Sequence, residues 1–530
     1  MMKTDFDAIV IGAGFGGVYA LHKLRNELGL TVRVFEKGGG VGGTWYWNRY
    51  PGAMSDVDGH VYKYSFDKEL LQDWEWSTRY ASQAENLAYL HAVVERHNLI
   101  GDIQFDTEIE SAAYDERRAA WTVADSRGAR FTARYLVTAL GPHSSRNFPD
   151  IAGLDRFEGT VVHTGAWPDG LSIAGRRVGV IGTGSTGTQF VCAAAQTTAH
   201  LTVFQRTPQY VVPSGDRAVA AEEVAAIRAG YDGIWEQIHD SRVGCGFAES
   251  DVPAMSVSAE ERHRVFQEAW DAGNGFHFMF GTFGDIAVDP DANAAAADFI
   301  RAKIREIVRD PETARRLTPT ELFAKRPVCN QGYYESFNRD NVRLVSLRET
   351  PVVEAVPRGL LTADGAEHDL DVLVFATGFD AIVGGYRRMT IRGRAGLDLA
   401  ARWKDGARSY LGVSVSGFPN LFLVFGPHSP FSNLLPSIET QVDWITELIA
   451  AAEGSGRTSV EATRAAEDAW VSTCEQASAQ TLLPRVQSWI FGGNAPGERR
   501  TTLFYFPGLG PFRAKLREVA AAGYQGYSFD

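Results

Sequence analysis

Cysteine is scarce in this sequence, and its four copies are scattered. Cys192, Cys245, Cys329 and Cys474 stand far apart in a chain of 530 residues and form no CxxC pair. Neither a disulfide framework nor a thiol-based redox centre is therefore expected. A reducing compartment such as the cytoplasm suits this cysteine usage, and we assign no metal ligands.

Long apolar runs and an excess of positive charge are also lacking. No run of about 18 apolar residues occurs, so no membrane-spanning helix is expected. Residues 8–20 are apolar but rich in glycine and follow two aspartates, which favours a buried strand and its turn over a signal peptide. The net charge of −13 would repel nucleic acid and anionic membranes, so neither is expected as a partner. Any phosphate-bearing ligand must be held by local positive groups.

The composition is that of a globular protein with several domains. A chain of 530 residues is too long for one ordinary hydrophobic core. Its 45% hydrophobic and 22% charged residues are typical of soluble globular proteins. The sequence leaves the oligomeric state open, and a monomer is compatible with it.

A first glycine motif follows an apolar strand near the start of the chain. Residues 7–24, DAIVIGAGFGGVYALHKL, turn through Gly12, Gly14 and Gly17 into a helix-compatible pattern. In this context glycines let the backbone approach a pyrophosphate, which then lies at a positive helix N-terminus. A second strand ends in Glu36, 19 positions beyond Gly17, where a carboxylate can accept a hydrogen bond from a ribose hydroxyl. A single such motif can also be a tight turn of an unrelated α/β fold.

The same pattern recurs with Gly182, Gly184 and Gly187, each 170 positions after its counterpart. Two copies in the same local context imply two bound dinucleotides. At the position of the first carboxylate the second copy has a glutamine, followed by Arg206. A guanidinium can grip a 2'-phosphate that a carboxylate would repel. The first site therefore suits FAD and the second NADPH, although Arg206 can also be read as a solvated surface charge.

The rest of the chain fits an α/β fold with two Rossmann-like dinucleotide-binding domains and a helical insertion. A buried strand and glycine turn at residues 370–381 resemble the segment of two-dinucleotide-binding flavoproteins that returns to the FAD domain. We predict a discontinuous FAD-binding domain (1–141 and 388–530), a discontinuous NADP-binding domain (142–214 and 326–387) and a helical insertion (215–325). Residues 430–480 are also predicted to be helical, and residues 503–516 to form strand and loop.

The linker before the second glycine motif has a distinctive spacing. Phe157, Gly159, His163, Trp167 and Pro168 fit the pattern FxGxxxHxxxWP. This pattern, at this place, resembles the fingerprint of flavin-dependent Baeyer–Villiger monooxygenases. Further segments extend the resemblance over nearly the whole chain and are most similar to family members that oxidise cyclohexanone: TWYWNRYPGA, FAKRP, FNRDNVRL, GPHSPFSNLLPSIETQV and QSWIFG.

The resemblance implies conversion of ketones into esters or lactones with FAD, NADPH and dioxygen. NADPH would reduce FAD, dioxygen would add to the flavin, and the resulting flavin peroxide would attack the ketone. No amino-acid side chain supplies such an oxidant, so the cofactor must do so. The protein has to stabilise negative charge in a place that excludes water. The partners expected are therefore a small ketone and dioxygen.

The resemblance also assigns roles to particular residues. Arg326, which stays protonated at any working pH, is the expected catalytic cation, and Asp56 orients it beside the flavin. Lys325 is a partner of the 2'-phosphate, and His163 with Trp167 couples the linker to domain motion. Lys325 and Arg326 could otherwise be a plain surface pair, and Asp56 a turn residue.

Cofactor contacts are carried over in the same way. Those expected for FAD are Gly12, Gly14, Phe15, Gly17, Glu36, Gly43, Thr44, Trp45, Trp47, Asp56, Tyr62 and Ile109. Those expected for NADP are Gly182, Thr183, Gly184, Ser185, Thr186, Gly187, Gln189, Arg206, Thr207, Lys325, Arg326 and Trp489.

The resemblance further implies an apolar substrate pocket lined by Phe247, Phe276, Phe278, Phe431 and Leu434, which would bind a ketone mainly by burying hydrocarbon. Core packing is the competing interpretation for each of these side chains. Residues 426–436 lack an insertion found in relatives that accept bulky aryl ketones, which favours small to medium cyclic ketones. His143 and Arg146 depart from the apolar stretch of the family and are expected near the cavity mouth, where they would influence substrate choice.

Two other interpretations remain. An N- or S-oxygenating flavin monooxygenase would share both nucleotide motifs, although Trp167, Pro168 and Arg326 count against it. A catalytically silent nucleotide-binding or redox-sensing module would also share them, but candidates for every chemical role are present. A disulfide reductase is excluded because it would need the missing CxxC pair.

Overall fold

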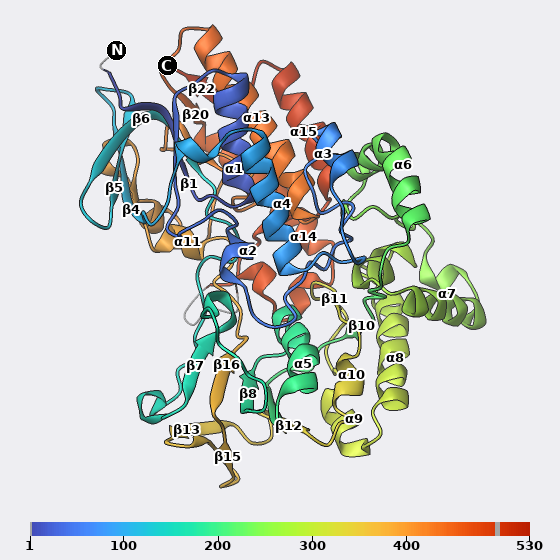
Figure 1. Ribbon diagram of the computed structural model, residues 1–530. Coiled ribbons are helices and arrows are strands. Elements are labelled where there is room, and N and C mark those ends of the chain that lie inside the picture. The colour runs from blue at the N-terminus through green and yellow to red at the C-terminus, as the bar shows by residue number, and fades with distance from the viewer. Residues whose placement is uncertain (1–2, 493–498) are drawn as a thin grey trace.

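Two sheets dominate the computed structural model, which describes residues 3–492 and 499–530 (Figure 1). The first sheet has eight strands in the order β17-β4-β5-β6-β1-β2-β3, with β18 paired to β6. Its neighbours are parallel except in the antiparallel β4-β5-β6 meander. The strands are β1 (Phe6–Ile11), β2 (Val32–Phe35), β3 (Ile103–Gln104), β4 (Ile109–Asp115), β5 (Ala120–Asp125), β6 (Arg130–Thr138), β17 (Thr390–Arg392) and β18 (Leu421–Leu423).

The second sheet has five strands, all parallel, in the order β12-β9-β8-β16-β7. They are β7 (Thr160–His163), β8 (Arg177–Ile181), β9 (His200–Gln205), β12 (Val342–Ser346) and β16 (Val372–Phe375). Smaller ladders pair β10 (Val211–Val212) with β11 (Val328–Cys329), β19 (Ser429–Pro430) with β21 (Phe504–Tyr505), and β20 (Val460–Ala462) with β22 (Tyr527–Phe529). An antiparallel ladder joins β13 (Val352–Val356), β14 (Gly359–Thr362) and β15 (Glu367–Asp369).

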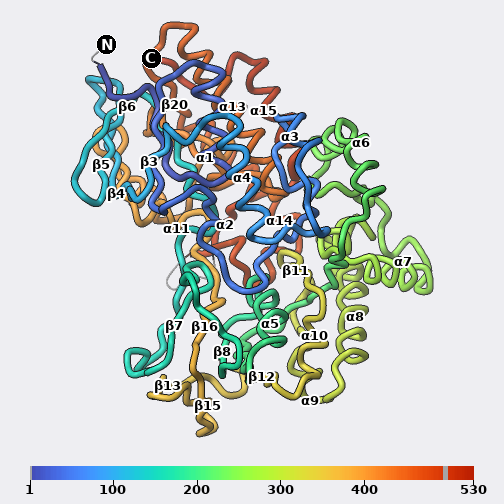
Figure 2. Tube along the Cα trace, in the orientation of Figure 1, coloured from blue at the N-terminus to red at the C-terminus, as the bar shows by residue number. Residues whose placement is uncertain are grey.

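Helices surround both sheets, and α6, α7 and α8 form one side of the molecule (Figures 1 and 2). The α-helices are α1 (Phe15–His22), α2 (Thr44–Trp47), α3 (Lys68–Asp73), α4 (Gln83–Arg96), α5 (Ser185–Thr197), α6 (Ala221–Asp240), α7 (Ala259–Ala272), α8 (Pro290–Ile307), α9 (Pro311–Leu317), α10 (Tyr333–Ser336), α11 (Gly384–Arg387), α12 (Leu399–Arg402), α13 (Leu434–Gly454), α14 (Arg464–Ala479) and α15 (Leu509–Ala521). In the part of the chain that the structure describes, none of them combines the length and apolar character needed to cross a bilayer.

Each sheet is covered on both faces because its strands alternate between two cores. Along β1, Ala8 and Val10 pack into a core with α1 and α13, whereas Ile9 and Ile11 face a core on the opposite side. In β16 of the second sheet, Val372 and Val374 face α5, while Leu373 and Phe375 face the ladder of β13 to β15. Strands buried on both faces are expected of parallel sheets.

The helical character predicted for residues 215–325 is confirmed by α6, α7, α8 and α9, and that predicted for residues 430–480 by α13 and α14. The prediction for residues 503–516 is partly wrong, because α15 begins at Leu509. Gly508, with φ +97°, ends the extended stretch. Pro511 then falls in the first helical turn, where its missing N–H costs nothing. The proline and glycine that suggested a loop therefore mark a helix start.

The two glycine turns have the same geometry. Gly12 (φ +102°) and Gly182 (φ +112°) adopt conformations that disfavour other residues. A Cβ on Gly17 would lie 1.7 Å from the carbonyl oxygen of Gly12, and one on Gly187 would lie 2.2 Å from that of Gly182. Each helix therefore starts directly against the end of its strand, and only glycine fits at the contact.

Replacing Gly17 by alanine is expected to destabilise the fold, because the added methyl group would meet a backbone oxygen that cannot turn aside. Overpacking typically costs about 1–3 kcal/mol. Gly233 in α6 is the matched control, because a Cβ there meets no atom within 4 Å and alanine favours a helix interior by about 0.5–1 kcal/mol. Thermal unfolding followed by circular dichroism should give a lower midpoint for Gly17→Ala and an equal or higher one for Gly233→Ala. A wild-type midpoint for Gly17→Ala would contradict the closed turn.

Candidate functional site

The first glycine turn meets the loop that leads into α2. Gly14 precedes α1, and no side chain caps the helix there. A Cβ on Gly14 would lie 3.4 Å from the Cα of Gly43, so the two loops are close together. Glu36, directly after β2, accepts hydrogen bonds from the N–H groups of Ala13 (2.8 Å) and Gly38 (2.7 Å). Burial raises the pKa of Glu36 above its usual range despite these bonds. A buried acceptor thus stands beside an open helix N-terminus.

Aromatic side chains lie next to this turn. The ring centroid of Tyr62 is 5.8 Å from that of Phe15 and 5.7 Å from that of Trp45. Trp47, at the end of the short helix that begins with Thr44, lies under the Lys37 ammonium at 5.5 Å. Ile109 is different, because it is buried in the core with Ile9 and Phe35. Phe15, Trp45 and Tyr62 thus form one aromatic group beside the turn, whereas Ile109 is a core residue.

Asp56 and Arg326 form an ion pair across 270 positions of sequence. The two guanidinium nitrogens lie 2.6 and 2.7 Å from the two carboxylate oxygens. Side-chain exposure is 23% for Arg326 and 20% for Asp56, so solvent screens the pair little. Burial would lower the pKa of Arg326, but Asp56 outweighs it and raises this pKa above its usual range. Phe276 lies 5.0 Å from the guanidinium carbon, and the Ser185 hydroxyl is 3.4 Å from Nη1. The cation is permanent and fixed.

His143 stands beside this pair. Its ring centroid is 5.3 Å from Phe379 and 6.0 Å from Trp489. Burial first, and the nearby Arg326 second, lower the pKa of His143 to about 4, so its imidazole is neutral at neutral pH. Arg146 is exposed and lies over Phe148 instead. Of the two residues that depart from the apolar stretch of the family, His143 is the one near the Asp56–Arg326 ion pair.

The second glycine turn faces open space. A Cβ on Gly184 would meet no atom within 4 Å, and no side chain caps α5. Thr183 donates a hydrogen bond to the carbonyl of Thr207 (3.0 Å), which ties the turn to the segment after β9. Gln189 is turned the other way, because it accepts from the Tyr50 hydroxyl (2.7 Å) and donates to the Met54 carbonyl (3.1 Å). Gln189 therefore connects α5 to the loop at residues 50–54, which follows α2.

Three cationic side chains lie near this turn. Arg206 directly follows β9 and is exposed. Lys325 forms an ion pair with Glu321, with Nζ 2.8 Å from Oε2. Arg348, which follows β12, reaches the same carboxylate at 2.9 Å and the Thr207 hydroxyl at 3.5 Å. A phosphate group could bind among these cations.

The linker histidine is buried and doubly hydrogen-bonded. His163 Nδ1 accepts from the N–H of Gly165 (3.0 Å), so Nε2 carries the proton and donates to the carbonyl of Gly378 (3.2 Å). Burial lowers the pKa of His163 to about 4, which keeps it neutral. Its ring lies 5.4 Å from that of Phe379. Trp167 packs separately, against Phe190 of α5 at 5.7 Å.

The predicted pocket residues lie in three different surroundings. Phe276 and Phe247 belong to a cluster with Val61 and Leu509. Phe431 and Leu434 pack in the core of the first sheet. Phe278 is fully buried among Phe266, Phe299 and Phe323. Only Phe276 contacts Arg326 directly.

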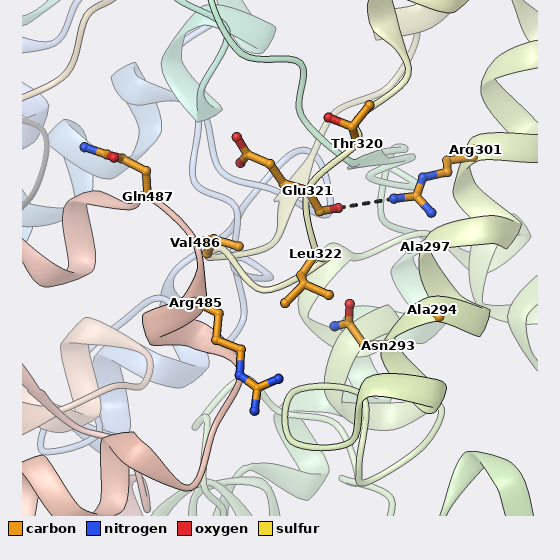
Figure 3. Close-up of a pocket in the computed structure, with 10 residues that line it drawn as sticks. All are labelled: Asn293, Ala294, Ala297, Arg301, Thr320, Glu321, Leu322, Arg485, Val486 and Gln487. Carbon is orange, nitrogen blue, oxygen red and sulfur yellow. Dashed lines mark hydrogen bonds between the residues drawn. The ribbon is translucent and has the colours of Figure 1, made fainter.

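A cavity of about 410 Å³ lies between α8, residues 320–322 and residues 485–487 (Figure 3). None of the predicted pocket residues lines it. A smaller cavity beside it is lined by Gln209, Glu321, Lys325 and Arg326 among others. Arg326 of the ion pair lines the smaller cavity and not the larger one.

The sequence analysis missed Arg348 and Glu321. A signal for Arg348 was present, because this residue follows β12 just as Arg206 follows β9. These strands are parallel neighbours, with Ser346 in register with Gln205. Residues after their carboxyl ends must therefore meet at one edge of the sheet. Glu321 had no such signal.

Comparison with known proteins identifies the family of this chain. Residues 6–235 match the family described as pyridine nucleotide-disulphide oxidoreductase. The chain is 60% identical over 525 residues to phenazine N-monooxygenase PhzNO1 of Lysobacter antibioticus, covering 99% of this chain and 97% of the relative. It is 51% identical over 521 residues to a Baeyer–Villiger monooxygenase of Pseudooceanicola batsensis, covering 98% and 96%.

A solved structure of cyclohexanone monooxygenase from Rhodococcus sp. Phi1 bound to NADP⁺ superposes with a TM-score of 0.98 at 56% identity, covering 99% of both chains. Sequence and fold agree over almost the entire length. The chain belongs to the family of flavin-dependent Baeyer–Villiger monooxygenases.

Proposed function

We propose that this protein is a Baeyer–Villiger monooxygenase that uses FAD, NADPH and dioxygen to convert ketones, such as small to medium cyclic ketones, into lactones or esters. The observation that carries this proposal is the Asp56–Arg326 ion pair, because it fixes a permanent cation beside Ser185, the first residue of α5 after the second glycine turn. For cyclohexanone, one atom of dioxygen enters the lactone and the other leaves as water while NADPH is oxidised to NADP⁺.

The residues of the first site fit FAD. The uncapped α1 N-terminus and the glycine turn leave backbone N–H groups for a pyrophosphate. Glu36 would accept from a ribose hydroxyl, and the group of Phe15, Trp45 and Tyr62 would border the ring system. The predicted contacts at Gly43, Thr44, Trp47 and Ile109 belong to the same proposal. When bound, the flavin supplies the activation of dioxygen and the oxygen transfer.

The residues of the second site fit NADPH. The α5 N-terminus is uncapped and open above Gly184, with Ser185, Thr186 and Gly187 in its first turn. Arg206, Thr207 and Lys325 would hold the 2'-phosphate, which a carboxylate at the position of Gln205 would repel. Trp489 would contribute its indole donor to the same nucleotide. Gln189 would act on the nucleotide only indirectly, because its side-chain amide is hydrogen-bonded to Tyr50 and Met54.

Arg326 would stabilise negative charge on the substrate oxygen and on the attacking oxygen. Asp56 fixes the guanidinium with two bonds and maintains its charge. Such a preorganised charge costs no reorganisation during the reaction. Phe276 covers the guanidinium, and we assign it with Phe247, Phe431 and Leu434 to an apolar wall that binds hydrocarbon and excludes water. Phe278, predicted as a member of this wall, is instead fully buried in another cluster.

N-oxygenation of an aromatic ring nitrogen is a second candidate activity. The 60% identity to a phenazine N-monooxygenase favours it. Oxygen transfer to nitrogen forms no tetrahedral oxyanion, so this activity would depend less on Arg326. Ketone and phenazine substrates therefore separate the two candidates.

We also propose the predicted domain boundaries of 1–141 with 388–530, 142–214 with 326–387, and 215–325. The strands of the first sheet, from residues 6–138 and 390–423, and those of the second, from 160–375, support them. A cytoplasmic location agrees with four cysteines that form no disulfide. A single chain brings the proposed site residues together, which supports an active monomer.

The first test is a product assay. The FAD-loaded protein, mixed with NADPH, cyclohexanone and isotopically labelled dioxygen, is expected to yield ε-caprolactone with one labelled oxygen atom, detected by mass spectrometry. Phenazine is assayed in parallel. NADPH oxidation that gives only hydrogen peroxide across a panel of ketones, together with an N-oxide from phenazine, would replace the Baeyer–Villiger assignment by the second candidate.

Replacing Arg326 by alanine is expected to lower kcat for ketone oxidation by about 10²-fold or more, the usual loss for a preorganised oxyanion donor. Arg326→Lys should also be impaired, because an ammonium cannot match the two-point contact with Asp56. Flavin content and the thermal midpoint serve as checks on folding. Arg358, whose side chain is 70% exposed, provides the control Arg358→Ala, with wild-type activity expected. Full ketone oxidation by Arg326→Ala would remove the proposed role.

Replacing His163 by alanine is expected to slow turnover or to uncouple NADPH oxidation from product formation while FAD stays bound. The variant loses the bonds to Gly165 and Gly378 that hold the linker to the turn after β16. The measurements are lactone formed per NADPH consumed and the flavin absorbance. His200→Ala is the control, because His200 is exposed at the start of β9. An unchanged ratio and rate for His163→Ala would reject the coupling role.

A further inference from the structure

One carboxylate occupies the place where the second nucleotide's phosphate is expected. Glu321 lies between Lys325 and Arg348, with N–O distances of 2.8 and 2.9 Å. Arg348 also reaches the Thr207 hydroxyl at 3.5 Å, and Arg206 precedes Thr207 in the chain. Lys325, which is proposed to bind a 2'-phosphate, is thus paired with a carboxylate of the protein itself, and Arg348 links the same carboxylate to Thr207.

This carboxylate is charged and only partly screened. Its side chain is 31% exposed, and that of Lys325 is 20% exposed. Burial alone would raise the pKa of Glu321, but Lys325 and Arg348 outweigh it and hold this pKa below its usual range. At neutral pH the carboxylate is therefore ionised and satisfies two of the cations around it.

A phosphate dianion and this carboxylate cannot both bind Lys325 and Arg348. Like charges at hydrogen-bonding distance repel, and the cations have a limited number of donors. The carboxylate must move when the phosphate arrives. A nucleotide with a free 2'-hydroxyl imposes no such movement.

The surroundings allow the Glu321 side chain to move while its backbone stays in place. The Glu321 carbonyl oxygen accepts hydrogen bonds from the Tyr210 hydroxyl (2.6 Å) and from Arg301 Nη2 (3.2 Å). In Figure 3 the carboxylate points away from Arg301, which holds only the backbone. Glu321 also borders the 410 Å³ cavity, whose wall carries Arg485. The cavity therefore leaves room beside Glu321 for a displaced side chain.

We propose that Glu321 is an internal counter-ion that the 2'-phosphate of the cofactor displaces, and that Arg348 is a further ligand of this phosphate. The inference rests on the proposed use of NADPH. Glu321 keeps the cations paired until a phosphate competes for them. It therefore weakens the binding of 2'-phosphorylated nucleotides and leaves the binding of others unchanged.

The test is calorimetric titration of the oxidised, FAD-loaded protein with 2',5'-ADP and with 5'-AMP. Glu321→Gln is expected to bind 2',5'-ADP about tenfold more tightly than the wild type, the scale of an ordinary coupling between two binding events. Arg348→Gln is expected to bind it about tenfold more weakly. Neither variant should change the Kd of 5'-AMP.

Glu349→Gln is the matched control. This neighbouring carboxylate pairs with Arg315 and Arg316, so its loss changes the net charge equally but frees neither Lys325 nor Arg348. Wild-type Kd values are expected for both nucleotides. Tightening in this control equal to that in Glu321→Gln would reduce the effect to overall charge and overturn the inference.

The remaining outcomes are decisive in different ways. Unchanged or weaker binding of 2',5'-ADP by Glu321→Gln would overturn the inference, because Glu321 would then be holding Lys325 and Arg348 in place for the phosphate. Wild-type affinity in Arg348→Gln would remove Arg348 as a ligand. A wild-type protein that binds 2',5'-ADP no better than 5'-AMP would overturn the NADPH assignment itself, and the inference with it.

Discussion

The ion pair of Asp56 and Arg326 is the constraint on which the site depends. Removing two such charges from water costs several kcal/mol per ion unless geometry and pairing compensate. Here both guanidinium nitrogens meet both carboxylate oxygens. Asp56 belongs to the loop after α2 in the first region, whereas Arg326 precedes β11 beside the second sheet. Arg326 is therefore positioned only when the loop after α2 and the segment before β11 are packed together. The ion pair contributes more to positioning this cation than to stability.

A path of packed rings leads from the linker to His143, whose pKa is influenced by the nearby Arg326. Phe379 lies 5.4 Å from His163 and 5.3 Å from His143, and His143 lies 6.0 Å from Trp489. Burial lowers the pKa of both histidines to about 4, so the path transmits shape and hydrogen bonding but no change of charge at neutral pH. Because interiors are close-packed, a shift of the linker must move Phe379 or open a void. Packing thus gives the linker a physical route to the site.

The parts of the fold and site that could be predicted from sequence are those fixed by local geometry. Gly12 and Gly17 predicted a strand–turn–helix unit, because no side chain fits between the end of the strand and the start of the helix. The role predicted for Glu36, accepting a hydrogen bond from a ribose hydroxyl, was inferred from its position directly after the next strand, β2. Phe278, by contrast, was grouped with Phe276 only by the resemblance to the family, and the two rings lie in different clusters. Glu321 could not be found, because its meaning comes from Lys325 and Arg348, which converge on it only in three dimensions.

The two nucleotide turns share their backbone but differ in electrostatics, and this difference controls which nucleotide each turn accepts. At the first turn a buried carboxylate, Glu36, bonds the backbone and would repel a 2'-phosphate. At the second turn, Gln205 stands at the corresponding position and donates a hydrogen bond to the carbonyl of Arg316. This position therefore carries no carboxylate, and cations lie at this edge of the second sheet. In a chain with a net charge of −13, exposed cations would attract any anion. Because Glu321 already pairs with Lys325 and Arg348, an incoming anion gains only the difference between its own binding to these cations and that of the carboxylate.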